Sequence, residues 1–140
     1  MTVAGERMRR QQGRVIFRGR ARGLALVSPV AIGFLGGVDP DTGVVIERGH
    51  PLYGQCIAGR VLVFPTGKGS TVGSYTLYRL SKRGVAPVAI INAQSEAIVA
   101  VGAIMAGIPM VDLVDTGQIA TGDVVEVDGG DVVIGQAAFD

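Results

Sequence analysis

The stretch that decides the fold runs from residue 60 to residue 84 and reads RVLVFPTGKGSTVGSYTLYRLSKRG. Four apolar residues after Arg60, rich in β-branched side chains, predict a buried strand over residues 60–64. A Pro- and Gly-rich turn follows, and then a helical pattern over residues 71–83. Two basic residues and Gly84 close this pattern, as is typical of the end of a helix. The stretch therefore predicts a strand, a loop and a helix in immediate succession.

The same order repeats directly downstream. Residues 88–91 form a second β-branched run, and residues 95–106 form an apolar helical segment that Gly107 and Pro109 bring to an end. Two strand–helix units in succession predict a parallel pair of strands joined by a right-handed crossover.

Strand-like segments flank this central region on both sides. They are residues 14–17, 23–27, 44–47 and a hairpin around Asp-Gly-Gly over residues 124–134. The Gly-Arg-Ala-Arg-Gly stretch at residues 19–23 is expected to form a bend or a bulge. With 140 residues, 48% of them apolar, we expect one α/β domain over residues 13–140, with a mixed, barrel-like or three-layered sheet and flanking helices. Residues 1–12 show no apolar period and are expected to form a flexible basic tail.

The charge of the chain is small but unevenly distributed. The formal net charge is +1, which argues against a dedicated nucleic-acid binder. Seven of the 13 basic residues lie before residue 23, whereas seven acidic residues and no basic one lie from Asp112 onward. The two segments could neighbour each other, be solvated separately, or leave a basic docking surface for an acidic partner.

Cysteine usage and hydropathy exclude several classes of protein. The single cysteine, Cys56, provides no disulfide framework and no cysteine metal site within this chain. The most apolar stretch, residues 97–106, is about half as long as a membrane span, and no apolar segment of a signal peptide follows the basic start. We therefore expect a soluble, cytoplasmic protein that contacts no membrane.

The loop that follows the strand at residues 60–64 carries the chemistry of interest. It is not a Walker phosphate loop, because it lacks the first glycine and the Ser or Thr directly after the lysine. Gly67 and Gly69 would nevertheless let a ligand approach the backbone, and amides of Ser70, Thr71 and Val72 at a helix start would favour a carboxylate or phosphate. Alternatively, Ser70 or Thr71 is only the N-cap of the helix. These patterns leave both interpretations open.

Two further polar side chains lie in loops. Lys68 could stabilise an ionised serine, bind the phosphate or carboxylate of a substrate, or only be solvated, and the sequence does not distinguish these roles. His50, the only histidine, lies between Gly49 and Pro51, where a structural or solvated role is the ordinary case. Without a second histidine or a cysteine cluster, we expect no metal centre built by this chain alone.

Four ordered motifs of the chain resemble those of the small subunit of aconitase X. They are Gly36-Gly37-Val38-Asp39-Pro40-x-Thr42-Gly43, His50-Pro51, Gly67-Lys68-Gly69-Ser70-Thr71-x-Gly73-Ser74-Tyr75 and Gly107-Ile108-Pro109-Met110-Val111-Asp112, spread over roughly residues 13–135. The resemblance implies a swivelling β/β/α domain like the fourth domain of aconitases. It also implies a heterodimer whose large subunit holds a 4Fe–4S cluster through its own cysteines.

The resemblance also implies roles for individual residues. Ser70 would accept the proton in a dehydration, while the iron of the large subunit would act as Lewis acid on the departing hydroxyl. The residues expected to contact the substrate are Gly67, Lys68, Gly69, Thr71, Ser28 and Asp39. Asp39 has an alternative role as a turn-forming residue before Pro40.

Two activities are associated with the resembling family. One is the dehydration of mevalonate 5-phosphate in an archaeal variant of the mevalonate route to isoprenoids, and the other is the dehydration of cis-3-hydroxy-L-proline in bacteria. We favour the first, because a separate short subunit fits the archaeal form. The competing hypotheses are a stand-alone anion-binding module without catalysis and a purely structural partner subunit. In the favoured case we expect activity only in the presence of the large subunit.

Overall fold

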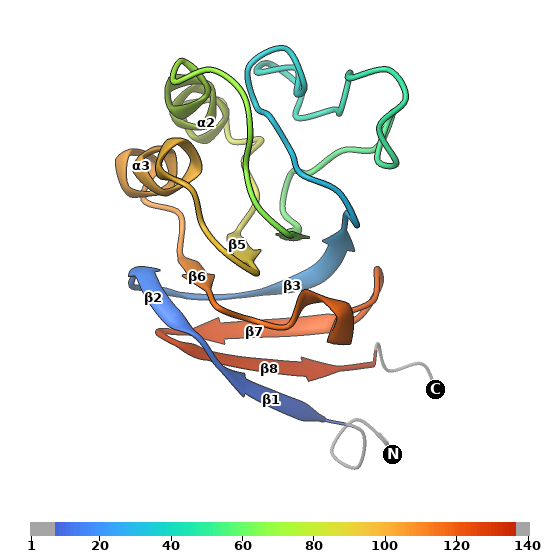
Figure 1. The fold of residues 1–140 in the computed structure, drawn as a ribbon, viewed down its shortest axis with the longest axis vertical. Coiled ribbons are helices and arrows are strands. Elements are labelled where there is room, and N and C mark those ends of the chain that lie inside the picture. Colours follow the sequence, from blue (N-terminus) through green and yellow to red (C-terminus); the bar gives the residue numbers. More distant parts are fainter. Residues whose placement is uncertain (1–7, 137–140) are drawn as a thin grey trace.

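The computed structural model describes residues 8–136 and contains one mixed eight-stranded sheet covered by two α-helices (Figure 1). The strands are β1 (Arg9–Gln12), β2 (Arg14–Phe17), β3 (Arg20–Val27), β4 (Val61–Phe64), β5 (Ala89–Asn92), β6 (Met110–Asp112), β7 (Val124–Asp128) and β8 (Asp131–Gly135). The helices are α2 (Gly73–Lys82) and α3 (Ala97–Ala106), and a short 3-10 helix, η1, covers Thr116–Gln118. Within residues 8–136 no helix has the length and apolar character to cross a membrane.

The sheet curls until its two edges nearly meet. Its strand order is β1-β8-β7-β3-β4-β5-β6-β2, so β1 and β2 lie at opposite edges although only Gly13 separates them in the sequence. The amide of Gly13 donates to the carbonyl of Gly130 at 2.8 Å, and a side chain at Gly13 would overlap Val111. Because β1 and β2 are connected by one residue, the strands between them must close into a barrel-like shape.

Strand β3 links the antiparallel and parallel halves of this sheet. Its residues 20–24 pair antiparallel with β7, and its residues 25–27 pair parallel with β4. Strands β4, β5 and β6 continue the parallel half, and α2 and α3 form the crossovers between them. The strand–helix–strand–helix order predicted for the centre of the chain is confirmed, and so is the hairpin of β7 and β8.

The strands of the parallel half are buried on both faces. In β4, Leu62 and Phe64 face a core shared with the helices, whereas Val61 and Val63 face the interior of the curled sheet. Both faces of a central parallel strand are covered, so a continuous apolar run is the pattern that such a strand requires. The result is three layers: the antiparallel strands, the parallel strands and the helices (Figure 1).

Both helices begin two residues later than the sequence predicts. Helix α3 begins at Ala97 because Glu96 caps it, its carboxylate accepting hydrogen bonds from the amides of Ile98 and Val99 at 2.8 Å each. The expected first residue, Ser95, instead donates through its amide and hydroxyl to Asp112. A carboxylate at the N-terminus of a helix is also favoured by the helix dipole.

Three expectations about the strands are wrong. Residues 9–12, expected within the flexible tail, form β1 and pair with β8, whose backbone supplies a partner that a run of Arg and Gln does not reveal. Residues 20–22, expected in a bend, continue β3 along β7. Residues 44–47 contribute only isolated bridges at Val44 and Val45. The remaining tail residues 1–7 lie outside the described residues.

Ion pairs join part of the basic N-terminal segment to the acidic C-terminal segment. Three arginines near the start of the chain bind acidic residues near its end: Arg9 with Asp123, Arg14 with Asp112, and Arg20 with Glu126. For these three, the prediction that the basic and acidic segments neighbour each other is confirmed.

Candidate functional site

The loop at residues 65–72 leaves β4 and leads into α2 beside the segment that follows β3. A parallel bridge joins Ile32 to Gly67: the amide of Ile32 donates to the carbonyl of Thr66 at 3.2 Å, and the amide of Lys68 donates to the carbonyl of Ile32 at 3.1 Å. The segment that follows β3 and the loop that follows β4 therefore adjoin at one end of the domain, in agreement with the rule that ligand-binding loops lie beyond the carboxyl ends of parallel strands.

Ser70 lies exposed in this loop with its hydroxyl close to the start of α2. Its Oγ accepts a hydrogen bond from the amide of Val72 at 3.2 Å. The N-cap of α2 is Val72, which offers no side-chain acceptor, so neither Ser70 nor Thr71 is the N-cap of this helix. The alternative interpretation, in which Ser70 or Thr71 is the N-cap, is therefore wrong.

Three backbone amides beside Ser70 remain available to a ligand. Within residues 8–136, the amides of Gly69, Ser70 and Thr71 have no acceptor, whereas that of Val72 is bound by the Ser70 hydroxyl. Unpaired amides ahead of a helix, together with the positive end of its dipole, favour a carboxylate, a phosphate or a developing oxyanion. The donor set lies one residue earlier than predicted, because Val72 is already bound.

Glycine is required at two positions of this loop for different structural reasons. Gly69 has φ of 97°, a conformation that a residue with a side chain rarely adopts. Gly67 is buried, and a Cβ at this position would overlap the Glu96 carboxylate and Val99 of α3. Gly67 therefore lets the loop pack against the start of α3, and Gly69 lets the chain turn toward Ser70.

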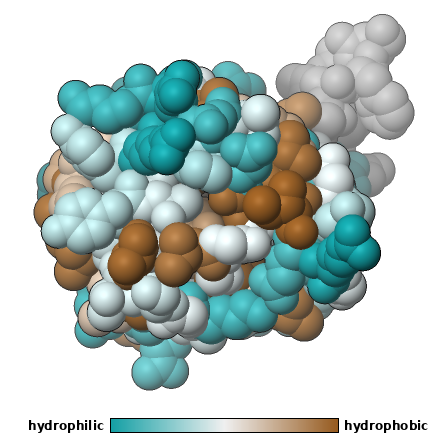
Figure 2. Space-filling model, turned by 90° about the horizontal axis from the view of Figure 1, so that it is seen from above, coloured by the Kyte–Doolittle hydropathy of each residue, from teal (hydrophilic) through white to brown (hydrophobic). Residues whose placement is uncertain are grey.

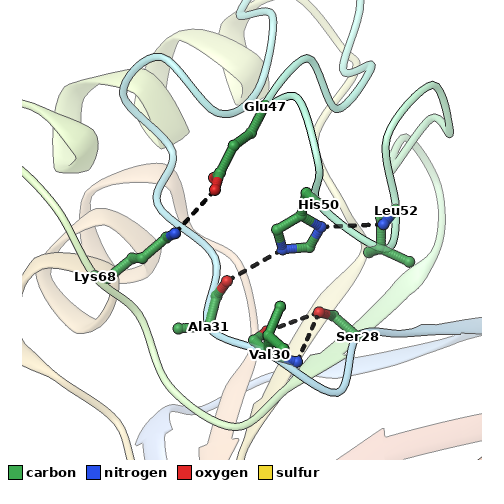
Figure 3. Close-up of polar contacts among 7 residues, drawn as sticks. All are labelled: Ser28, Val30, Ala31, Glu47, His50, Leu52 and Lys68. Atoms are coloured by element: carbon green, nitrogen blue, oxygen red, sulfur yellow. Dashed lines mark hydrogen bonds and ion pairs between the residues drawn. The ribbon is translucent and has the colours of Figure 1, made fainter.

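Lys68 and His50 each form polar contacts with a neighbouring loop (Figure 3). The Nζ of Lys68 lies 2.9 Å from Oε2 of Glu47, in a pair that is about half exposed. His50 is buried; its Nδ1 accepts from the amide of Leu52 at 3.0 Å, so its Nε2 carries the proton and donates to the carbonyl of Ala31 at 3.1 Å. His50 is structural, while the Glu47 carboxylate neutralises the charge of Lys68 beside the loop.

The side chains of Ser28 and Asp39 form hydrogen bonds within their own turns. The buried Ser28 hydroxyl donates to the carbonyl of Val30 at 2.7 Å and accepts from its amide at 3.1 Å (Figure 3). The Asp39 carboxylate accepts from the amide of Asp41 at 2.9 Å, and Asp41 in turn binds Arg79 near the C-terminal end of α2. The structure therefore supports the turn-forming role of Asp39, and among residues 8–136 the side chains of Ser28 and Asp39 make no hydrogen bond to the 67–71 loop.

A buried carboxylate near the same sheet edge was missed by the sequence analysis. Asp112, at the end of β6, is fully buried and accepts hydrogen bonds from Arg14 at 2.8 and 2.9 Å and from the Ser95 hydroxyl at 2.7 Å. Burial alone would raise the pKa of Asp112, but the hydrogen bonds from Arg14 and Ser95 outweigh it and hold that pKa below its ordinary value. These bonds connect β2, β6 and the start of α3.

The described residues do not form a metal or cluster site. Among residues 8–136 there is no group of three or more His, Cys, Asp or Glu side chains that could hold a metal ion. Cys56 is exposed, and its thiol donates to the carbonyl of Thr42 at 3.4 Å. An iron–sulfur cluster therefore does not fit on this part of the chain.

The curled β/β/α fold with a serine on a glycine loop at the start of a helix defines a swivel domain of the aconitase type, and comparisons with known proteins agree. A family model, aconitase X swivel domain, matches residues 10–135. The chain belongs to this family, which confirms both the resemblance and the fold that it implied.

The most similar relatives include small subunits of one enzyme. The chain is 61% identical over 121 residues to the phosphomevalonate dehydratase small subunit of Methanocella arvoryzae, covering 84% of this chain and 92% of the relative. It is 56% identical over 119 residues to that of Thermococcus sibiricus, covering 85% and 92%. The crystal structure of Thermococcus kodakaraensis aconitase X in its holo-form matches with a TM-score of 0.88 and 52% identity, over 90% of this chain and 98% of that one.

Proposed function

We propose that this chain is the small subunit of a phosphomevalonate dehydratase, a hydro-lyase that converts mevalonate 5-phosphate to anhydromevalonate phosphate in the mevalonate route to isoprenoids. The observation that carries the proposal is the identity of 61% to a small subunit of that name over 92% of the relative's length. The chain thus corresponds to one subunit of the enzyme, and we expect it to act as a heterodimer with the large subunit, in the cytoplasm.

Ser70 is the residue that we assign to catalysis. With its hydroxyl ionised, the Ser70 oxygen accepts the proton that the substrate loses from carbon. The substrate's hydroxyl group leaves with its bonding electrons and receives this proton from Ser70, so that water is released and Ser70 is ionised again. A serine hydroxyl is only weakly acidic, so the ionised form that accepts the proton has to be stabilised. The free amides of Gly69, Ser70 and Thr71 and the start of α2 supply that stabilisation, because they favour negative charge near the Ser70 oxygen.

The remaining loop residues are assigned to binding and positioning. Thr71 and the backbone at Gly67 and Gly69 border the position that an anionic group of the substrate would take. Lys68 contributes a cation that Glu47 holds at 2.9 Å. Because that pair is exposed, a phosphate could replace the Glu47 carboxylate at little cost.

We assign the 4Fe–4S cluster to the large subunit. The described residues of this chain lack a set of ligands for it, and Cys56 has no second cysteine in the sequence to join it. The small subunit would then supply the proton acceptor and the large subunit the cluster, so that the active site forms between them.

Assays of the assembled pair test this proposal. The chain coexpressed with the large subunit of its own organism should dehydrate mevalonate 5-phosphate and leave cis-3-hydroxy-L-proline unchanged. Turnover of the hydroxyproline alone would assign the other family activity. Binding of phosphorylated metabolites by the isolated chain, with no turnover by the pair, would show a stand-alone anion-binding module instead.

A further inference from the structure

Helix α3 has an unusual composition for a helix at the surface. Its sequence, AIVAVGAIMA, has no charged or polar side chain, yet Val101, Ile104 and Met105 are 47%, 50% and 38% exposed. A helix that is apolar on all sides is normally buried on all sides. Among residues 8–136, nothing therefore covers the outer face of α3.

An apolar groove runs between α3 and α2. It has a volume of about 260 Å³, and its lining includes Thr71, Tyr75 of α2, and Ile98, Val101 and Met105 of α3. The helices approach closely because residue 102 is glycine, where a Cβ would overlap Leu77. Thr71 follows Ser70 directly, so the groove opens beside the candidate catalytic loop.

Three further exposed apolar residues lie close to the same loop or to the Glu47 that pairs with its lysine. Val72 is 48% exposed, Leu35 is 50% exposed and lies next to Gly73, and Ile46 is 45% exposed next to the Glu47 that binds Lys68. Figure 2 shows hydrophobic side chains gathered in clusters between hydrophilic ones on the face seen from above. We call the set Leu35, Ile46, Val72, Tyr75, Val101, Ile104 and Met105 the apolar surface.

The residues of the apolar surface are all large and substantially exposed. Its seven residues are each between 38% and 64% exposed. Large apolar side chains exposed together near one loop of a soluble domain are typical of a surface that binds a partner.

We propose that the apolar surface is where the large subunit docks, with an apolar side chain of that subunit filling the groove between α2 and α3. The proposal rests on the proposed function, in which Ser70 completes a site in the large subunit. A partner that reaches Ser70 must also cover Val72 and Tyr75, which follow it on α2, and from there the groove and α3 are continuous. A second copy of this chain on the same surface would cover Ser70 and exclude the large subunit.

The test compares two aspartate variants of equally exposed residues. Val101→Asp places a charge on the apolar surface, and Leu24→Asp places one on β3, outside that surface; both residues are 47% exposed. Each variant is titrated with the large subunit of the same organism, and thermal unfolding of the isolated variants checks their folding. Ile104→Ser, at a 50% exposed position, provides a milder second variant on the apolar surface if Val101→Asp unfolds.

We expect Val101→Asp or Ile104→Ser to weaken assembly by about tenfold or more, and Leu24→Asp to leave it within about twofold. Unchanged assembly of a folded surface variant would overturn the docking proposal, and so would a stable homodimer of the isolated chain that Val101→Asp dissociates. Turnover by the wild-type pair is measured separately. If assembly depends on Val101 but the pair does not dehydrate mevalonate 5-phosphate, the docking surface stands and the proposed substrate is wrong.

Discussion

Replacing Ser70 by Ala should separate catalysis from stability. The Ser70 side chain is exposed and makes one hydrogen bond, accepted from the amide of Val72 at 3.2 Å. An exposed hydrogen bond contributes less than about 1 kcal/mol, small against a domain stability of about 5–15 kcal/mol. Folding and assembly should therefore be nearly normal. Turnover should fall by about 100-fold or more, because the proton acceptor is lost.

Ser74→Ala is the matched control, and the structure predicts the opposite behaviour. Ser74 lies inside α2, is 6% exposed, and its hydroxyl donates to the carbonyl of Ile98 at 2.7 Å, which joins α2 to α3. Loss of this bond should cost about 0.5–1.5 kcal/mol and lower the Tm by roughly 2–6 °C. Turnover of the assembled pair should remain close to that of the wild type.

The assay measures kcat and KM for mevalonate 5-phosphate on the assembled pair and Tm on each isolated small subunit. The serine-base assignment predicts that kcat falls only in Ser70→Ala and that Tm falls mainly in Ser74→Ala. If Ser70→Ala keeps near-normal turnover at saturating substrate and raises only KM, the loop binds an anion but Ser70 does not accept the proton.

Three further outcomes follow from the same geometry. The isolated chain should fold, with a cooperative thermal transition, but show no dehydratase activity; turnover in the absence of iron and of any partner would contradict the subunit assignment. Gly67→Ala should cost about 1–3 kcal/mol and reduce turnover, because its Cβ would overlap the Glu96 carboxylate and Val99; unchanged Tm and kcat would mean that the loop is not held in this way. The pKa of Asp112 is lowered in the folded chain, so its contribution to stability is present above the unfolded value of about 4 and is lost as the pH falls through the folded value. Urea unfolding between pH 7 and 2 should show a steeper acid loss in the wild type than in Asp112→Asn, and parallel curves would contradict the prediction.

The central part of the fold was predictable because its signals are local. The apolar run of β4, the glycine after α2 and the turn between β7 and β8 each determine structure through neighbouring residues. The parallel pairing of β4 and β5 follows from the same segments, because a strand–helix–strand unit has one favoured handedness.

The strands that the sequence did not reveal depend on distant partners. Strand β1 consists of two Arg and two Gln residues, and its backbone is satisfied by β8, more than a hundred residues away. Arg20 belongs to a strand rather than a bend because β7 pairs with it and Glu126 binds its side chain. No local pattern contains that information, since the same residues would be equally acceptable in a solvated tail or loop.

The candidate site likewise has a part that could be predicted from neighbouring residues and a part that could not. The run Gly67 to Thr71 is contiguous, so a possible preference for an anion could be proposed from these residues, whereas the proton-acceptor role of Ser70 rests on the resemblance to aconitase X. The roles of Ser28 and Asp39 could not be predicted in this way. Their side chains form hydrogen bonds within their own turns, and the geometry of these turns depends on the surrounding residues. The loop position of His50 made a structural role the ordinary expectation, and its two bonds to Ala31 and Leu52 confirm that role.

The position of Ser70 is fixed by packing rather than by bonds of its own side chain. Ile32 holds the loop through two backbone hydrogen bonds, and the start of α3 fits against the bare Cα of Gly67. Beyond these contacts the loop presents three free amides and an exposed hydroxyl, bordered by exposed Leu35 and Val72. Free donors would be costly if an apolar partner covered them without a ligand, because buried polar groups need hydrogen bonds. An anionic substrate enclosed between the two subunits satisfies both requirements, since it occupies the donors while the surrounding apolar residues are buried.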